Sequence, residues 1–184
     1  MRHFHQRVSA VVLVTTVAAV AVSAHADDGE SSSGRWRLEL QGMKAFTEDH
    51  SDRNGPAYYA ASAEYEWPML KRCTLGLRLY PLFVYPGHDS TNYGAGAGVA
   101  GRIYQNADVR DGLFVEGGVS ALVTGQEFER DNSKLNFLSE LGVGYQFPRN
   151  NWHIAVKLEH ISNAGLGPDN RGINAVGLGL GYTF

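Results

Sequence analysis

The stretch that decides the fold is Val176–Phe184, VGLGLGYTF. An apolar side chain stands at every second position of this stretch, with glycine or threonine between. Successive side chains of a β-strand point to opposite faces, so this period predicts a strand with one apolar face and one nearly bare face. The same period recurs in seven earlier segments, whose apolar positions begin at Trp36, Tyr59, Cys73, Tyr93, Leu113, Leu135 and Trp152. The sequence therefore predicts eight strands.

The second face of these segments indicates what surrounds the protein. Its positions carry charged side chains or glycine: Glu64, Glu66, Arg78, Gly94, Gly96, Gly98, Arg102, Glu116, Gly118, Glu140, Gly142, Gly144, Lys157, Glu159, Gly177, Gly179 and Gly181. A soluble barrel of the lipocalin type would instead turn its apolar side inward. The interior of an eight-stranded barrel is only just wide enough for side chains, so glycines and paired charges suit it and the apolar face meets lipid. We therefore predict an all-β protein, an eight-stranded antiparallel transmembrane β-barrel.

The segment ends support a membrane barrel. Aromatic residues stand near them, as interfacial girdles require: Trp36, Tyr59, Trp67, Tyr93, Tyr145, Phe147, Trp152, Tyr182 and Phe184. The connections alternate between expected turns at 68–72, 105–112 and 148–151 and mostly longer expected loops at 47–56, 86–92, 124–134 and 164–172. Membrane barrels have short periplasmic turns and long outer loops. Both ends of the barrel sequence are therefore expected on the periplasmic side.

The N-terminal residues have the pattern of a secretory signal peptide. Arg2 and Arg7 precede an apolar run over residues 8–22, and Ala24-His25-Ala26 supplies the small residues of a cleavage site. The alternative, a transmembrane anchor, needs about 20 apolar residues, which is more than this run contains. The predicted organisation is a signal peptide at 1–26, a flexible polar lead-in at 27–34 and the barrel at 35–184.

The composition excludes several kinds of chemistry. Among the 184 residues Cys73 is the one cysteine, so neither an internal disulfide nor a paired-cysteine site can form. The formal charge of −3 becomes −5 without the two arginines of the predicted signal peptide, which disfavours a nucleic-acid partner. The run 96–101 matches GxGxxG but lies within a strand pattern, whereas a dinucleotide site needs a strand-to-helix turn. His153 and His160 point to opposite faces of one strand, so we predict no metal site and no cofactor.

The segment Glu159–Gly165 departs from the apolar pattern. His160 and Ser162 are two residues apart, so both side chains project from one face of the strand, about 7 Å apart. Continuing the alternation from Trp152 to Leu158 puts them on the lipid-facing side, near the outer end. Polar side chains in contact with lipid are energetically unfavourable, so their presence there indicates a functional role. The alternative is that the strand has already left the hydrocarbon at this point, and the alternation alone leaves both interpretations open.

The same region carries a resemblance to a known family. The alternating final segment closed by Phe184 resembles the C-terminal strand of Gram-negative outer-membrane barrels. The segment 160–166, followed by Asn170, Gly172 and Ile173, resembles the signature of the outer-membrane lipid A 3-O-deacylases, the PagL family. Further matching pieces follow in the same order, at 83–85, 114–118, 135–137 and 142–147, so that the resemblance covers residues from about 75 to 184.

The resemblance assigns roles to residues by position. Ser162 resembles the family's nucleophile and His160 its general base, whereas Asn163, Gly165 and Asn170 lie where oxyanion contacts would come from. The family places a glutamate at position 174 to orient the histidine, and this chain has Asn174. Strand alternation still puts Asn174 on the outer face, on the strand that pairs with that of His160. Two further carboxylates are weaker substitutes for the glutamate, because Glu159 faces inward and Asp169 lies in a loop.

What the resemblance implies is a carboxylic ester hydrolase in the outer membrane of a Gram-negative bacterium. Its substrate would be lipid A, or lipopolysaccharide, from which it would remove the 3-hydroxyacyl chain at position 3 without a cofactor. Two alternatives remain at this point. One is a catalytically silent barrel that binds lipopolysaccharide, which the neutral Asn174 motivates. The other is a structural or adhesive barrel whose outer loops meet another partner.

Overall fold

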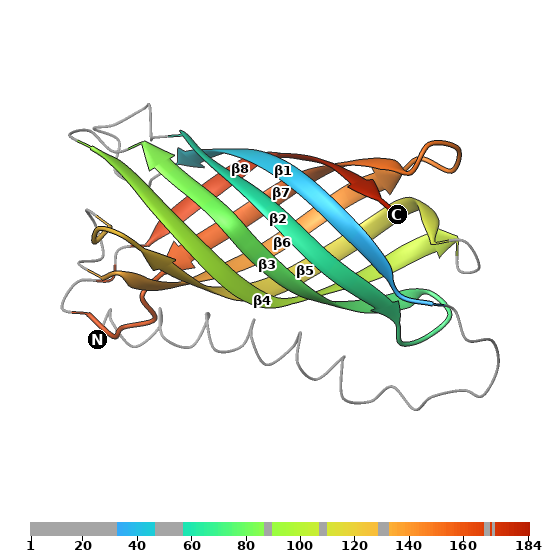
Figure 1. Ribbon diagram of the computed structural model, residues 1–184, viewed down its shortest axis with the longest axis horizontal. Coiled ribbons are helices and arrows are strands. Elements are labelled where there is room, and N and C mark those ends of the chain that lie inside the picture. Colours follow the sequence, from blue (N-terminus) through green and yellow to red (C-terminus); the bar gives the residue numbers. More distant parts are fainter. Residues whose placement is uncertain are drawn as a thin grey trace, which may run out of the picture.

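The protein is a closed antiparallel β-barrel (Figure 1). The computed structural model describes residues 33–46, 57–86, 90–106, 110–128, 133–167, 170 and 172–184. Its strands are β1 (Arg35–Phe46), β2 (Ala57–Pro68), β3 (Cys73–Pro86), β4 (Thr91–Asn106), β5 (Asp111–Thr124), β6 (Leu135–Gln146), β7 (Trp152–Ser162) and β8 (Ile173–Thr183). Each strand pairs with the next, and β8 pairs with β1 to close the barrel. The predicted eight-stranded architecture is confirmed, whereas the predicted signal peptide lies outside the described residues.

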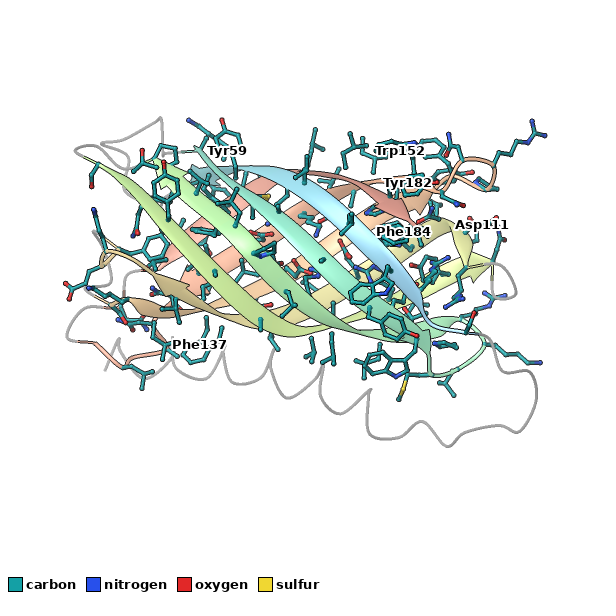
Figure 2. The ribbon with its side chains drawn as sticks, viewed as in Figure 1. Tyr59, Asp111, Phe137, Trp152, Tyr182 and Phe184 are labelled. Atoms are coloured by element: carbon teal, nitrogen blue, oxygen red, sulfur yellow. The ribbon has the colours of Figure 1, made fainter. Side chains whose placement is uncertain are left out.

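The alternation of side chains determines the two surfaces of the barrel wall. The apolar positions point outward, and Leu40 and Leu77 are 68% and 58% exposed. Figure 2 shows Trp152, Tyr182 and Phe184 at one end of the barrel and Tyr59 and Phe137 at the other. Aromatic rings at both ends of an apolar band are typical of a barrel that crosses a bilayer. Within the described ranges, no helix is long and apolar enough to cross a membrane.

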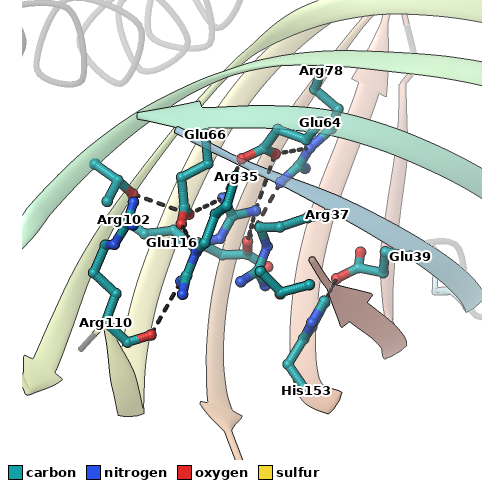
Figure 3. A network of polar contacts seen from close by, with 12 residues as sticks. Arg35, Arg37, Glu39, Glu64, Glu66, Arg78, Arg102, Arg110, Glu116 and His153 are labelled. Carbon is teal, nitrogen blue, oxygen red and sulfur yellow. Dashed lines mark hydrogen bonds and ion pairs between the residues drawn. The ribbon is translucent and has the colours of Figure 1, made fainter. Parts of the chain in front are cut away.

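The middle of the lumen is filled by paired charges (Figure 3). Arg78 lies 2.7 Å from Glu64 and also contacts Glu140. Arg102 contacts Glu64 and lies 2.8 Å from Glu116. A buried cation or carboxylate is tolerated when it is paired and hydrogen-bonded, so these contacts explain how the wall accommodates its charged face.

A second group of buried charges meets on β1 and β7. The Nζ atom of Lys157 lies 2.5 Å from Glu39 and 3.2 Å from Glu116. Gly179 pairs with Gln41 of β1, and a Cβ atom there would come within 2.8 Å of the carboxyl carbon of Glu39, two residues away on the same strand. The glycine therefore leaves the space that the carboxylate occupies, as the alternation of charged and tiny residues predicts.

The outer end of the lumen is apolar, which differs from the predicted interior of charges and glycines. A buried cluster fills it: Met43, Ala45, Tyr58, Ala60, Tyr80, Phe83, Tyr85, Leu122, Phe128, Leu138, Ile161, Ile173 and Ala175. The pairing of β3 shifts register between Tyr80 and Phe83, and this irregularity turns Phe83 inward. Phe128 comes from the loop after β5, with its ring centroid 5.0 Å from that of Tyr85. The cluster gives β7 and β8 an apolar support on the side away from lipid.

One connection is shorter than expected. The sequence predicts a turn over residues 105–112, but β4 extends to Asn106 and β5 begins at Asp111. These two residues pair, and the Asn106 amide donates to the Asp111 carboxylate at 2.6 Å. The polar side chains thus continue the strands beyond the apolar band.

Candidate active site

His160 and Ser162 lie on the outer wall of β7, at the end of the barrel away from the short turns. Both side chains are half-buried, whereas the alternate residues Glu159 and Ile161 are buried inside. The β6–β7 pairing sets Ser162 opposite Phe137, which Figure 2 shows at the end opposite to Phe184. The alternation of the strand therefore delivers the two polar side chains to the lipid-facing surface, as predicted.

Asn174 lies directly across from His160 in the pairing of β7 with β8. The His160 Nδ1 atom is 2.8 Å from the Asn174 Oδ1 atom. An amide oxygen only accepts hydrogen bonds, so the proton of the neutral imidazole resides on Nδ1. The Nε2 atom then carries the lone pair, which is the arrangement that a general base needs.

Ser162 shares the face of His160, but the two side chains are not hydrogen-bonded to each other in the described part of the chain. A serine reorients by rotation about one torsion angle. In enzymes without substrate, the hydrogen bond between nucleophile and base is often long and tightens on binding. The structure thus brings His160 and Asn174 together and places Ser162 beside them on the same wall.

The chain turns sharply after Ser162. Ala164 and Gly165 both have positive φ angles, 54° and 82°. The Gly165 N–H donates to the Asn163 side-chain oxygen at 2.8 Å, and the Leu166 N–H donates to the Asn163 carbonyl at 3.0 Å. The side chain of Asn163 is fully buried in this turn. The Gly165 amide is therefore committed to the turn, and the turn fixes the end of the strand that carries Ser162.

Two loop residues and one strand residue complete the sequence-predicted neighbourhood. Asn170 is exposed, and Asp169 lies outside the described residues. Glu159 points inward, where it accepts hydrogen bonds from Tyr58 at 2.6 Å and Gln41 at 2.9 Å. Glu159 consequently does not replace the glutamate that the family places beside its histidine.

Gly172 is a site residue to which sequence reasoning gives no role. Its φ angle is +67°, and a Cβ atom there would lie 2.8 Å from His160 Cε1 and 3.4 Å from Nε2. The backbone of residue 172 thus lies against the edge of the imidazole that carries the lone pair. Glycine is required twice, by the left-handed conformation and by the close approach of the ring.

The buried histidine takes no part in this site. His153 lies inside the barrel, with Nε2 3.1 Å from Glu39, on the opposite face of β7 from His160. Within the described ranges, no group of three or more His, Cys, Asp or Glu side chains could hold a metal ion. The polar groups that the described structure places at this site are His160, Ser162, Asn174 and the turn around them.

The fold and this surface define an outer-membrane β-barrel with a polar site on its lipid-facing wall. The family model of the lipid A 3-O-deacylases (PagL) matches residues 19–183, and the chain belongs to this family. No curated protein matches the chain.

Solved structures of several barrels resemble the chain. The crystal structure of the outer membrane enzyme PagL has a TM-score of 0.61 and 19% identity, covering 78% of this chain and 98% of that one. The N-terminal barrel domain of Pseudomonas aeruginosa OprF follows with a TM-score of 0.51 and 17% identity, over 83% and 100% of the two chains. Neisserial surface protein A has a TM-score of 0.51 and 10% identity, over 82% and 97%. At these identities the likeness shows the fold, and membership of the family rests on the family model.

Proposed function

We propose that this protein is an outer-membrane esterase that removes the 3-hydroxyacyl chain ester-linked at position 3 of lipid A. The observation that carries the proposal is the hydrogen bond between His160 Nδ1 and Asn174 Oδ1, 2.8 Å long and on the lipid-facing wall. It supplies an oriented base where an acyl chain of the membrane can reach it. Membership of the lipid A 3-O-deacylase family supports the substrate.

The proposed reaction proceeds by covalent catalysis. The Nε2 atom of His160 takes the proton of the Ser162 hydroxyl, and the Ser162 oxygen attacks the ester carbonyl. The tetrahedral intermediate collapses, His160 returns the proton to the sugar oxygen, and the acyl chain remains on Ser162 until water releases it. Asn170, which is exposed, is the candidate side-chain donor to the developing oxyanion, whereas the side chain of Asn163 is buried in the turn. His160 carries the proton in both halves of the reaction, first from Ser162 to the sugar oxygen and then from the attacking water back to Ser162, while the amide donor only hydrogen-bonds the oxyanion.

The proposed location is the outer leaflet. The two ends of the barrel wall meet where the Trp36 N–H donates to the Phe184 carbonyl at 2.9 Å, at the end with the short turns. In membrane barrels that end is periplasmic, which puts His160 and Ser162 at the cell surface. We also propose that residues 1–26 are a cleaved signal peptide that directs the chain to secretion, with 27–34 as a lead-in.

Mass spectrometry of lipid A tests this function. Cells that express the protein should yield lipid A lighter by one hydroxyacyl chain, and fragmentation should assign the loss to position 3. Cells expressing Ser162→Ala at the same level serve as the control and should retain the chain. An unchanged spectrum in both strains would favour the silent barrel that binds lipopolysaccharide, for which the neutral Asn174 is the motivating observation. It would equally suit the structural or adhesive barrel.

A substitution at Gly172 tests the position of the imidazole. Gly172→Ala should lower the deacylation rate about tenfold or more, because the new methyl group displaces His160 and the positive φ strains the backbone. Gly165→Ala is the matched variant: its φ of +82° imposes the same strain, but its Cβ atom would have nothing within 4 Å. We expect a smaller loss there, measured as release of 3-hydroxy fatty acid in detergent. Equal losses in the two variants would mean that backbone strain, and not contact with His160, is responsible.

A further inference from the structure

The polar side chains of the lipid-facing rows are concentrated around the candidate site. The outward positions of the described strands are otherwise apolar or small. The exceptions on neighbouring strands β6, β7, β8 and β1 are Ser139, His160, Ser162, Asn174 and Lys44. The others, Thr91, Gln105 and Asp111, lie at the ends of β4 and β5. Lys44 is the member of this group that the proposed hydrolysis does not use.

Lys44 lies beside the site in the barrel wall. In the β1–β8 pairing Phe46 is opposite Asn174 and Lys44 is opposite Val176. Lys44 is level with Leu158, so it lies two strands across from His160 and two residues along the strand, about 10 Å laterally and about 7 Å along the wall. The Lys44 side chain is exposed and points to the lipid side, as does Phe46, which is 51% exposed. A flexible four-carbon stem lets its ammonium group reach toward a lipid headgroup bound at Ser162.

Within the described ranges, Lys44 has no ion-pair partner. The carboxylates of the strands around it, Glu39, Glu64, Glu66, Glu116, Glu140 and Glu159, are all buried in the lumen. Its neighbours in register are Val176 and Ala57, and neither carries a charge. A cation on a lipid-facing row is unfavourable compared with an apolar residue, and such residues commonly have a functional partner. Lys44 therefore presents its charge on the lipid side of the wall, where a lipid phosphate can reach it.

We propose that Lys44 binds a phosphate monoester of the lipid A headgroup and thereby orients the sugar so that its 3-O-acyl ester meets Ser162. This inference rests on the proposed deacylase function and adds a specificity-determining contact to it. Lipid A is a phosphorylated glucosamine disaccharide, and a compact ammonium group forms strong charge-assisted hydrogen bonds with phosphate. The position of Lys44 on the same wall as Ser162 lets one substrate molecule engage both residues.

The test compares two substrates in micelles of an uncharged detergent. One is lipid A with its phosphates, and the other is the same lipid A after enzymatic dephosphorylation. We expect the wild-type protein to prefer the phosphorylated substrate, and Lys44→Met to reduce the ratio of the two kcat/KM values about tenfold, mainly through KM. Lys44→Arg should retain most of the preference. Lys71→Met removes an exposed lysine from the turn between β2 and β3, at the opposite end of the barrel, and should leave the ratio unchanged.

The outcomes separate this inference from the proposed function. Heat-dependent gel migration of each variant first establishes that the barrel has formed. An active Lys44→Met variant with the wild-type substrate ratio would overturn the inference and leave the deacylase intact. If Lys44→Met lowers the substrate ratio only when phosphatidylglycerol is added to the micelles, Lys44 binds neighbouring lipids and not the substrate. That result would also overturn the inference. Wild-type protein that releases no fatty acid from either substrate would instead refute the proposed function.

Discussion

Replacing Ser162 by alanine is expected to lower the rate of lipid A hydrolysis by at least about 10³-fold, because no acyl-enzyme can then form. His160→Ala should have a similar effect, since the serine would lose its base. Both side chains lie on the outer wall and leave the ion pairs of the lumen untouched. Membrane insertion and heat-dependent migration should therefore match the wild type. The rate is measured as release of 3-hydroxy fatty acid from purified lipid A in detergent.

Ser139 offers a matched control for this experiment. It is a second half-buried serine on the same face, opposite His160 in the β6–β7 pairing, and its hydroxyl is 3.5 Å from the His160 carbonyl. Ser139→Ala should change the rate by less than about threefold, since a contact of that length contributes little. A serine-reactive sulfonyl fluoride should label Ser162 and require His160 to do so. If Ser162→Ala keeps most of the activity, the nucleophile has been assigned to the wrong residue.

Asn174→Glu is expected to raise the rate by about 10- to 100-fold. The amide of Asn174 holds the His160 ring at 2.8 Å, but it cannot offset the positive charge that the ring acquires when Ser162 attacks. In a serine protease, exchanging the carboxylate for an amide lowers turnover by about 10⁴. A half-buried site on the outer wall should depend less on that charge. Asn174→Asp introduces the same charge as Asn174→Glu but keeps the side-chain length of asparagine. Comparing the two variants therefore separates the effect of charge from that of side-chain length.

Asn174→Ala should lower the rate about tenfold, because the ring then loses the acceptor that fixes its tautomer and orientation. The measurement is the same fatty-acid release, with the fold of each variant established by its gel migration. Unchanged rates in both the alanine and the glutamate variants would remove residue 174 from the mechanism. A complete lack of activity in the wild type and in Asn174→Glu alike would favour the silent barrel.

The fold was predictable from the sequence to the extent that lipid contact determines it. Leu178 and Leu180 lie outward and Gly179 inward. Each strand separates an apolar from a polar environment, so apolar and polar or small residues alternate along it. The alternation of apolar and polar residues ends at the edge of the apolar band. Asn106 and Asp111 pair at the ends of β4 and β5, where the residues are polar and their sequence resembles a turn.

The apolar cluster at the outer end was not predictable in the same way. Phe128 is an isolated apolar residue in a polar connection, and its packing on Tyr85 joins segments about 40 residues apart. No local period marks such a contact. The inward position of Phe83 depends on an irregularity in the β3–β4 pairing, which shifts the alternation within a single strand.

The candidate site divides along similar lines. The strand period places His160, Ser162 and Asn174 on one face, and the pairing of consecutive strands makes Asn174 a neighbour of His160. The 2.8 Å hydrogen bond between them depends on side-chain torsions that a sequence does not show. The contact of Gly172 with the imidazole likewise arises from the path of a loop, although its glycine signals that a side chain is excluded there.

The paired charges of the lumen have a consequence for the cell envelope. Arg78, Arg102 and Lys157, held between their carboxylates, lie across the middle of the lumen, and the apolar cluster with Phe128 fills the end near His160 and Ser162. An ion or small polar solute would have to break these contacts in order to pass. We therefore expect the barrel to conduct few ions, so that many copies of it would leave the permeability barrier of the membrane intact.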